Sequence, residues 1–213
     1  MKTYKDLLYK YLPTQSVPVI FEWLEFYNVQ LKINRTRITK LGDYRPPLHY
    51  KYHRISVNHD LNKYHFLITL VHEFAHLKVW GKYKKNVKPH GIEWKTEFRE
   101  LMQNFTHEGV FPKDILNILN TYLYNPSSPS ASKALLLILR KYDGNNKYLT
   151  LEELPDNSVF QIYNGLTFIK FERMRKRYKC KRLDNNRIYL VSPLMKVVPV
   201  KKNKTVISLL DKD

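Results

Sequence analysis

An apolar stretch in the first half of the chain, residues 70–77, reads Leu-Val-His-Glu-Phe-Ala-His-Leu. His72 and His76 stand four positions apart, and on an α-helix such residues lie one turn apart on the same face. Both imidazoles can then bind one metal ion. Glu73 follows His72 by about 100° round the helix, close enough to reach a water molecule on that metal. The pattern predicts part of a catalytic zinc site with Glu73 as its base.

Apolar residues flank this stretch on both sides. Residues 66–71 (Phe-Leu-Ile-Thr-Leu-Val) lead into it, and Val79 and Trp80 follow. A helix that is apolar on most faces is typical of a buried position, and we expect it from about Leu61 to Trp80, with Gly81 at its C-terminal end. Burying two histidines and a glutamate is costly unless they are paired or bind metal. The alternative is a structural helix whose histidines are satisfied by hydrogen bonds.

Two histidines are too few for a catalytic zinc site, so a third ligand must come from elsewhere. His90 is well placed, because it follows in a Pro-His-Gly turn that opens the next predicted helix, and the intervening loop can fold back to the metal. His90 could instead cap that helix or lie on the surface. Other zinc sites take a glutamate from a later helix, and the candidates of that kind are Glu93, Glu97 and Glu100.

Two blocks around these histidines resemble the SprT-like metallopeptidases. Residues 69–76 (Thr-Leu-Val-His-Glu-Phe-Ala-His) are similar to the His-Glu-x-x-His helix of that family, and residues 89–94 (Pro-His-Gly-Ile-Glu-Trp) to its His-Gly-x-x-aromatic block. The upstream segments 37–45 and 55–58 are similar too. The resemblance covers residues 17–105. The family includes the Spartan protease, which cleaves proteins crosslinked to DNA.

The resemblance implies an α+β fold, in which a zincin-like helical domain carries a small antiparallel sheet. It implies Zn2+ held by His72, His76 and His90, with Glu73 as general base. The implied activity is that of a zinc endopeptidase, with a protein substrate and with DNA, single-stranded or damaged, as a partner that could activate it. Many members end in a four-cysteine zinc ribbon, but this chain has one cysteine, Cys180, so a second structural zinc is not expected.

Periodicity and composition predict the organisation of the whole chain. Residues 125–132 (Asn-Pro-Ser-Ser-Pro-Ser-Ala-Ser) read as a linker between a metallopeptidase domain at 1–124 and a small, basic, all-β module at 133–213. Asn164-Gly165 lies between two β segments and indicates a hairpin. Besides the metal-binding helix, we expect helices at 3–12, 17–27, 92–102, 113–124 and 134–142, and strands at 29–34, 35–40, 53–58, 159–163, 166–171, 173–182, 187–191 and 195–200.

The chain is strongly basic, with 37 Lys and Arg against 19 Asp and Glu and a net charge of +18. This balance favours an anionic partner such as nucleic acid or a membrane surface. Residues 170–182 are especially basic, and as one strand they would place five candidate nucleic-acid-binding residues on one face: Arg173, Arg175, Arg177, Lys179 and Lys181. Such a face could follow a phosphate backbone. The alternative is a solvated face without a ligand.

Two further basic segments lie near the predicted metal site. Residues 44–54 interleave aromatic and cationic side chains, which suits either stacking on unpaired bases or an ordinary loop beside the site. Between His76 and His90 the chain carries Lys82, Lys84, Lys85 and Lys88. The charge of these lysines must lie near the cleft, where they could bind DNA or only keep the loop solvated.

No segment of the sequence predicts a membrane span. The longest strictly apolar run, residues 134–139, is too short to cross a bilayer. The N-terminal residues lack the apolar core and cleavage site of a signal peptide. We therefore expect a cytoplasmic protein without a membrane partner.

Two functions from different classes fit these patterns. The first is the zinc endopeptidase, acting on DNA-bound or DNA-crosslinked proteins. The second is a non-proteolytic nucleic-acid-binding or transcription-related regulatory protein whose metal is structural. A closed structural zinc site has four protein ligands, so the second function would require a further ligand such as Glu93 or His59.

Overall fold

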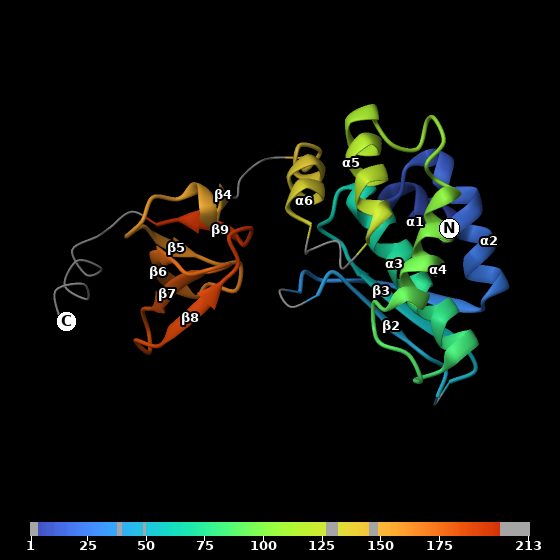
Figure 1. Ribbon diagram of the computed structural model, residues 1–213, viewed down its shortest axis with the longest axis horizontal. Helices are drawn as coiled ribbons and strands as arrows, with labels where there is room; N and C mark the ends of the chain where they lie inside the picture. The colour runs from blue at the N-terminus through green and yellow to red at the C-terminus, as the bar shows by residue number, and fades with distance from the viewer. Residues whose placement is uncertain (1–3, 38–39, 49, 127–131, 145–148, 201–213) are drawn as a thin grey trace. The chain divides into compact units, whose positions relative to one another are not determined.

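The computed structural model in Figure 1 describes residues 4–37, 40–48, 50–126, 132–144 and 149–200. Residue contacts divide the chain into two compact units, residues 1–144 and 145–213. The described part of the first unit contains helices and a three-stranded sheet, and that of the second a six-stranded sheet. The expected mixture of a helical unit with a small sheet and a separate β module is therefore present. None of the described helices is long and apolar enough to cross a membrane.

Helix α3 is the central element of the first unit. It contacts α1, α4 and the strands β2 and β3, and residues 66–71 on it are all buried. The elements of this unit are α1 (Tyr4–Tyr11), α2 (Val17–Phe26), β1 (Val29–Asn34), β2 (Gly42–Arg45), β3 (His53–Asn58), α3 (Lys63–Tyr83), α4 (Ile92–Gln103), α5 (Lys113–Tyr124) and α6 (Lys133–Arg140).

The two ends of α3 differ slightly from the sequence expectation. Asn62 caps the first turn, because its side chain accepts hydrogen bonds from the backbone N–H groups of Tyr64 and His65. Gly81 does not end the helix, which continues to Tyr83 and stops where Lys84 takes a positive φ of 55°. The metal-binding pattern therefore lies well inside a regular helix, several residues from either end.

The three-stranded sheet has the order β1-β3-β2. Strands β2 and β3 are antiparallel, as expected, but β1 runs parallel to β3. The expectation of a purely antiparallel sheet is wrong, because the chain leaves β1, crosses to the far edge of the sheet to form β2, and returns as β3 into the gap. Leu31 of β1 and Ile55 and Val57 of β3 are buried in the core of this unit.

The segment before β2 is held in place by one arginine. Arg37 donates hydrogen bonds to Asn58 Oδ1 (2.8 Å) and Ser56 Oγ (3.0 Å), both on β3. The strand begins only at Gly42, where the sequence predicts a turn after a strand at 35–40; residues 38 and 39 lie outside the described part. The arginine contacts thus set where the edge strand β2 starts, next to α3.

A buried ion pair joins α3 to α4. The Glu97 carboxylate is almost fully buried; its Oε2 lies 2.6 Å from Lys78 Nζ, and its Oε1 accepts a hydrogen bond from Lys82. Burial raises the pKa of Glu97, but the hydrogen bonds and charges of the two lysines outweigh this effect, so the pKa lies below its usual value of 4.5. A depressed carboxylate pKa stabilises the fold above the unfolded pKa, and this contribution is lost as the pH falls through the folded pKa.

Replacing Glu97 by glutamine is expected to lower the free energy of unfolding at pH 7 by about 1–2 kcal/mol, because two lysines lose their counter-ion. The difference from the wild type should begin to shrink as the pH falls below about 4.5, where the Glu97 carboxyl of the unfolded chain binds a proton, and should vanish once the pH is below the lower pKa of the folded state. Urea unfolding at pH 7 and pH 4 measures both effects. Glu100→Gln is the matched control, since that exposed carboxylate lies 3.6 Å from Lys78. Equal losses in the two variants at pH 7 would contradict the assignment.

The first unit continues past the predicted linker. Most of that linker, residues 127–131, lies outside the described residues. Helix α6 follows it and packs against α5, and Asn62 Nδ2 donates a hydrogen bond to the Leu139 carbonyl (2.8 Å). The apolar side of α6 is buried in the core of the first unit, so this helix belongs there and not to the module expected from residue 133; its buried residues are Leu135, Ile138 and Leu139.

The second unit is a small antiparallel sheet with the order β4-β9-β5-β6-β7-β8. The predicted hairpin joins β5 to β6, with Gly165 in a left-handed conformation (φ 84°). The core of this unit includes Phe160, Phe168 and Cys180. The strands are β4 (Leu149–Thr150), β5 (Val159–Gln161), β6 (Thr167–Arg173), β7 (Tyr178–Arg182), β8 (Ile188–Val191) and β9 (Lys196–Pro199).

Candidate metal centre

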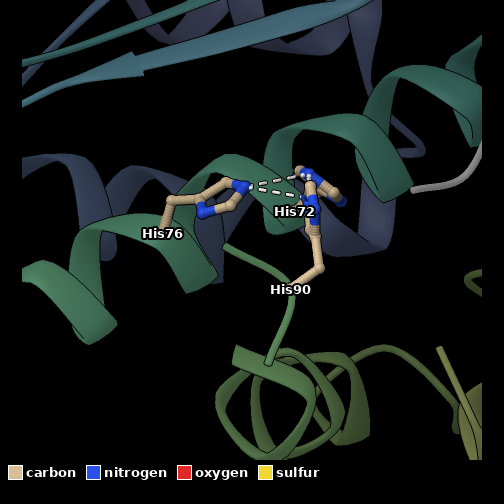
Figure 2. Close-up of side chains that lie close together, drawn as sticks. All are labelled: His72, His76 and His90. Carbon is tan, nitrogen blue, oxygen red and sulfur yellow. Dashed lines mark hydrogen bonds between the residues drawn. The ribbon is translucent and has the colours of Figure 1, made fainter. Parts of the chain in front are cut away.

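Three histidine side chains from two parts of the first unit point at one another. Figure 2 shows His72 and His76 on α3, and His90 on the loop that leads into α4. Their Nε2 atoms are separated by 3.1 Å (His72–His76), 3.2 Å (His76–His90) and 3.0 Å (His72–His90). The structure therefore brings together the three residues that the sequence predicts as metal ligands.

The chemistry of this cluster fits a bound metal ion. The Nε2 atom of a neutral imidazole is either a donor or an acceptor, so three such atoms cannot satisfy three mutual hydrogen bonds. Burial and the two neighbouring histidines lower the pKa of His72 to about 2, and burial and His90 lower that of His76 to about 4. Burial also lowers the pKa of His90. The rings are neutral at pH 7, and their lone pairs are available to a cation.

His90 reaches the cluster through a tight turn. Its φ is 60°, in the left-handed region that non-glycine residues adopt only at a cost of about 1–3 kcal/mol. The backbone N–H of Gly91 donates to the Lys88 carbonyl (2.9 Å), which closes the turn. Gly91, and not His90, is the N-cap of α4. The strained turn therefore serves to aim the imidazole at α3, and the capping role considered for His90 is excluded.

Trp94 forms a wall of the histidine cluster. Its ring centroid lies 4.6, 5.6 and 4.8 Å from those of His72, His76 and His90. Its indole Nε1 donates to the His72 carbonyl (3.4 Å), and its ring stacks on Phe98. This fully buried indole excludes water from one side of the cluster. The sequence resemblance contains Trp94, but sequence reasoning assigned it no role.

Glu73 lies on the same cleft as the three histidines. Its side chain is buried against β2, where the backbone N–H of Tyr44 donates to the carboxylate. Burial and the nearby charge of Asp43 raise the pKa of Glu73 to about 8, while Arg37, the Tyr44 N–H and Lys40 act in the opposite direction. A buried carboxyl with this pKa can exchange a proton near neutral pH.

The residues that hold Glu73 in place escaped the sequence analysis. A Cβ atom on Gly42 would lie only 2.3 Å from Glu73 Oε1, so glycine lets β2 approach the carboxyl. Arg37 positions the segment before that strand, and Tyr44 supplies its backbone N–H. All three belong to the segment 37–45 that resembles the family, which is the signal that could have revealed them.

Replacing Gly42 by alanine should displace the Glu73 carboxyl and spare the three clustered histidines. The added Cβ would meet three atoms of Glu73 at 2.3–2.9 Å, so the carboxyl must move. If this carboxyl acts as a catalytic base, we expect turnover to fall at least tenfold, because a displacement of about 1 Å at a catalytic group can cost about a hundredfold, with metal affinity unchanged. The matched control is Gly81→Ala on α3, where no atom lies within 4 Å. Full activity of Gly42→Ala would refute this positioning role.

The cleft around the histidines has a volume of about 610 Å³. Strand β2 lies on one side of it, α3 contributes residues from Thr69 to Trp80, and the loop from Lys84 to His90 lies on another side. No fourth His, Cys, Asp or Glu joins the three histidines within the described residues. Glu93 and His59, the candidates for a closed four-ligand site, are not part of the cluster. The arrangement leaves a coordination position on the cleft side, as in catalytic sites.

The strand that the sequence predicts at 173–182 is present only from Tyr178 onward. Strand β6 ends at Arg173 and β7 begins at Tyr178, so Arg175 and Arg177 lie in the hairpin turn. Arg173 pairs with Glu152 (3.3 Å) and Lys179 with Glu172 (3.3 Å). Lys179 and Lys181 do share one face of β7, because Tyr178 and Cys180, which alternate with them, are buried. The proposed nucleic-acid face is thus divided between a turn and a strand.

Lys170 does not contribute to the basic surface either. Its ammonium group is buried, donates to the Leu154 carbonyl (2.5 Å), lies 3.3 Å from Asp156 Oδ1, and sits 4.0 Å from the centre of the Tyr178 ring. These contacts connect Lys170 of β6 to residues 154–156 and to Tyr178 of β7. This lysine is not available to an external phosphate.

Comparison with known proteins agrees with this geometry. Residues 14–115 match the SprT-like family model. Residues 14–115 belong to the SprT-like family. The matched region contains the three histidines, Glu73 and β2, so every part of the SprT-like site described above lies within it. Neither the curated proteins nor the solved structures include a match to the chain. The SprT-like family is associated with metallopeptidase-like proteins.

Proposed function

We propose that this SprT-like protein is a zinc-dependent endopeptidase. The observation that carries the proposal is the convergence of three neutral imidazole nitrogens in a cleft that also contains the buried carboxyl of Glu73. Zinc is the metal proposed, because three histidines with an open position are typical of catalytic zinc sites. The absence of a fourth protein donor from the cluster among the described residues disfavours the alternative, a regulatory protein with a closed structural metal site.

The residues of the site would each have a separate role in hydrolysis. Zinc, when bound by His72, His76 and His90, supplies a Lewis acid that polarises the peptide carbonyl and lowers the pKa of water. Glu73 takes a proton from the attacking water and passes it to the leaving amine. Burial raises the pKa of Glu73, which makes its carboxylate a stronger base toward the water. The hydrogen bond from the Tyr44 N–H keeps the carboxyl facing the cleft during both transfers.

Strand β2 supports a peptide substrate beside this site. It is an edge strand of its sheet and lines the cleft with residues 42–44. An edge strand offers backbone donors and acceptors to an extended chain. An extended substrate segment would place a peptide bond between β2 and the histidine cluster.

We further propose DNA-bound or DNA-crosslinked proteins as substrates and DNA, single-stranded or damaged, as a partner. The net charge of +18 and the family resemblance support this part of the proposal. The exposed Arg175 and Arg177 in the β6–β7 turn are the first candidates for phosphate contacts.

Proteolysis of an unstructured protein tests the proposal. Wild-type protein with one equivalent of zinc should cleave it, chelator-treated protein should not, and added zinc should restore cleavage. Mass spectrometry of the new termini distinguishes peptide-bond hydrolysis from other causes of substrate loss. Each reaction is run with and without single-stranded DNA, which tests activation. A zinc-loaded protein that cleaves nothing in either condition would refute the endopeptidase.

A further inference from the structure

The loop between α3 and α4 brings cationic side chains to the cleft. Lys84, Lys85 and Lys88 line it together with His90, and all three lysines are exposed. Within the part of the chain that the structure describes, none of them forms an ion pair, whereas Lys78 and Lys82 bind Glu97 and Lys40 binds Asp43. These three lysines can therefore pair with an anionic ligand.

The acidic groups of the cleft do not neutralise these lysines. Asp43 Oδ1 lies 2.7 Å from Lys40 Nζ, and Asp43 Oδ2 lies 2.8 Å from Arg45 Nε. Glu73 is buried against β2 and is the proposed base. The loop side of the cleft thus carries an uncompensated positive charge, and low-dielectric walls strengthen its field.

The aromatic residues beneath the loop are fixed by their contacts. The ammonium of Lys84 lies 4.0 Å from the centre of the Trp80 ring. Trp80 meets the ring of His53 edge-on, with centroids 5.6 Å apart, and His53 Nδ1 shares a 2.9 Å hydrogen bond with the Tyr44 hydroxyl. A chain of contacts therefore runs from β2 under the cleft to Lys84. The Lys84 ammonium therefore packs on the Trp80 ring, whose position is fixed by its contact with His53.

The position of this surface along α3 sets its distance from the chemistry. Trp80 is one turn past His76, and Lys84 is one turn further, so the two lie about 6 and 12 Å along the axis at about 1.5 Å per residue. An extended peptide advances about 3.3 Å per residue. A substrate that runs along α3 would therefore bring a side chain roughly two to four residues from the cleaved bond to Lys84. Lys88 lines the same cleft two residues before His90.

We propose that the cleft selects substrate segments with an aspartate or glutamate two to four residues from the cleaved bond, bound by Lys84 and Lys88. The proposal rests on the endopeptidase function above, since the distance is counted from the scissile bond. An acidic peptide is favoured over a nucleic acid because the lysines share one cleft with β2 and the histidines.

Matched peptides test the proposal by binding and by cleavage. Two fluorescent peptides differ only in carrying glutamate or glutamine at the second to fourth residues on each side of one cleavable bond. Their affinities for zinc-loaded Glu73→Gln protein are measured by anisotropy, and their kcat/KM values with the wild type. We expect the glutamate peptide to be favoured about tenfold in both measurements, as two partly desolvated ion pairs provide, and less so at high salt.

The variant pair Lys84→Gln/Lys88→Gln should reduce this preference below about twofold, whereas Lys32→Gln/Lys113→Gln should keep it. Lys32 and Lys113 are exposed lysines on β1 and α5 that do not line the cleft. The control pair removes the same net charge, so any effect of overall charge appears equally in both proteins.

The outcomes separate this inference from the endopeptidase itself. If both peptides are cleaved equally well, the enzyme stands and the acidic preference is refuted. If neither is cleaved but the glutamate peptide binds more tightly, the preference stands and the peptidase fails. If Lys84→Gln/Lys88→Gln loses affinity for a single-stranded oligonucleotide while both peptides bind alike, the lysines serve nucleic acid and the proposal is overturned.

Discussion

A Glu73→Gln protein is expected to bind zinc like the wild type and to lose peptide-bond cleavage by a factor of about 10²–10⁴. Glutamine keeps the shape of the side chain, and its amide oxygen can still accept the hydrogen bond from Tyr44 N–H that the carboxylate receives. It cannot take a proton from water. Because Glu73 is not one of the three clustered donors, the ligand set is unchanged.

Two measurements on the same samples check this prediction. Zinc affinity is obtained by competition with a chromophoric chelator, and kcat/KM from the matched peptides. Glu93→Gln is the control, because Glu93 follows the ligand turn closely in sequence but is not part of the histidine cluster. That variant should keep both zinc and activity. Equal cleavage by Glu73→Gln and the wild type would exclude Glu73 as the base.

The contacts that orient Glu73 could not be predicted from the sequence. The spacing of His72, Glu73 and His76 predicts a shared site from helix geometry alone. The carboxyl, however, is oriented by Gly42 and Tyr44, which lie about thirty residues earlier on a strand whose position depends on pairing with β3. Periodicity carries no information on such a contact, so the sequence predicts the chemical group and not its support.

The turn within the basic segment of the second unit could not be predicted for a different reason. Cations at every second position from Arg173 to Lys181 suggest one strand with one charged face. The structure reverses the chain after Arg173, and Met174, which a single strand would turn inward, is 48% exposed. A charged alternation has no buried face to fix its register. In β7, by contrast, Tyr178 and Cys180 are buried, and there the expected alternation is present.

Replacing His90 by asparagine is expected to abolish tight zinc binding without unfolding the first unit. Asparagine tolerates the positive φ of this position better than most residues, so the turn is kept while the third nitrogen ligand is lost. The loss of zinc affinity should exceed the 10–100-fold that removal of a group outside the ligand set costs. Cleavage should disappear with the metal.

Thermal unfolding with and without zinc distinguishes this ligand loss from misfolding. A ligand at a hundred times its Kd stabilises the folded state by about 2.7 kcal/mol, so zinc should raise the Tm of the wild type and leave that of His90→Asn unchanged. Without zinc, the two proteins should unfold at similar temperatures, since asparagine keeps the positive φ of the turn. The control, His107→Asn, changes an exposed histidine outside the cluster and should respond to zinc like the wild type. A zinc-dependent rise in the Tm of His90→Asn as large as that of the wild type would show that the loop histidine is not a ligand, and the site would then need another third donor.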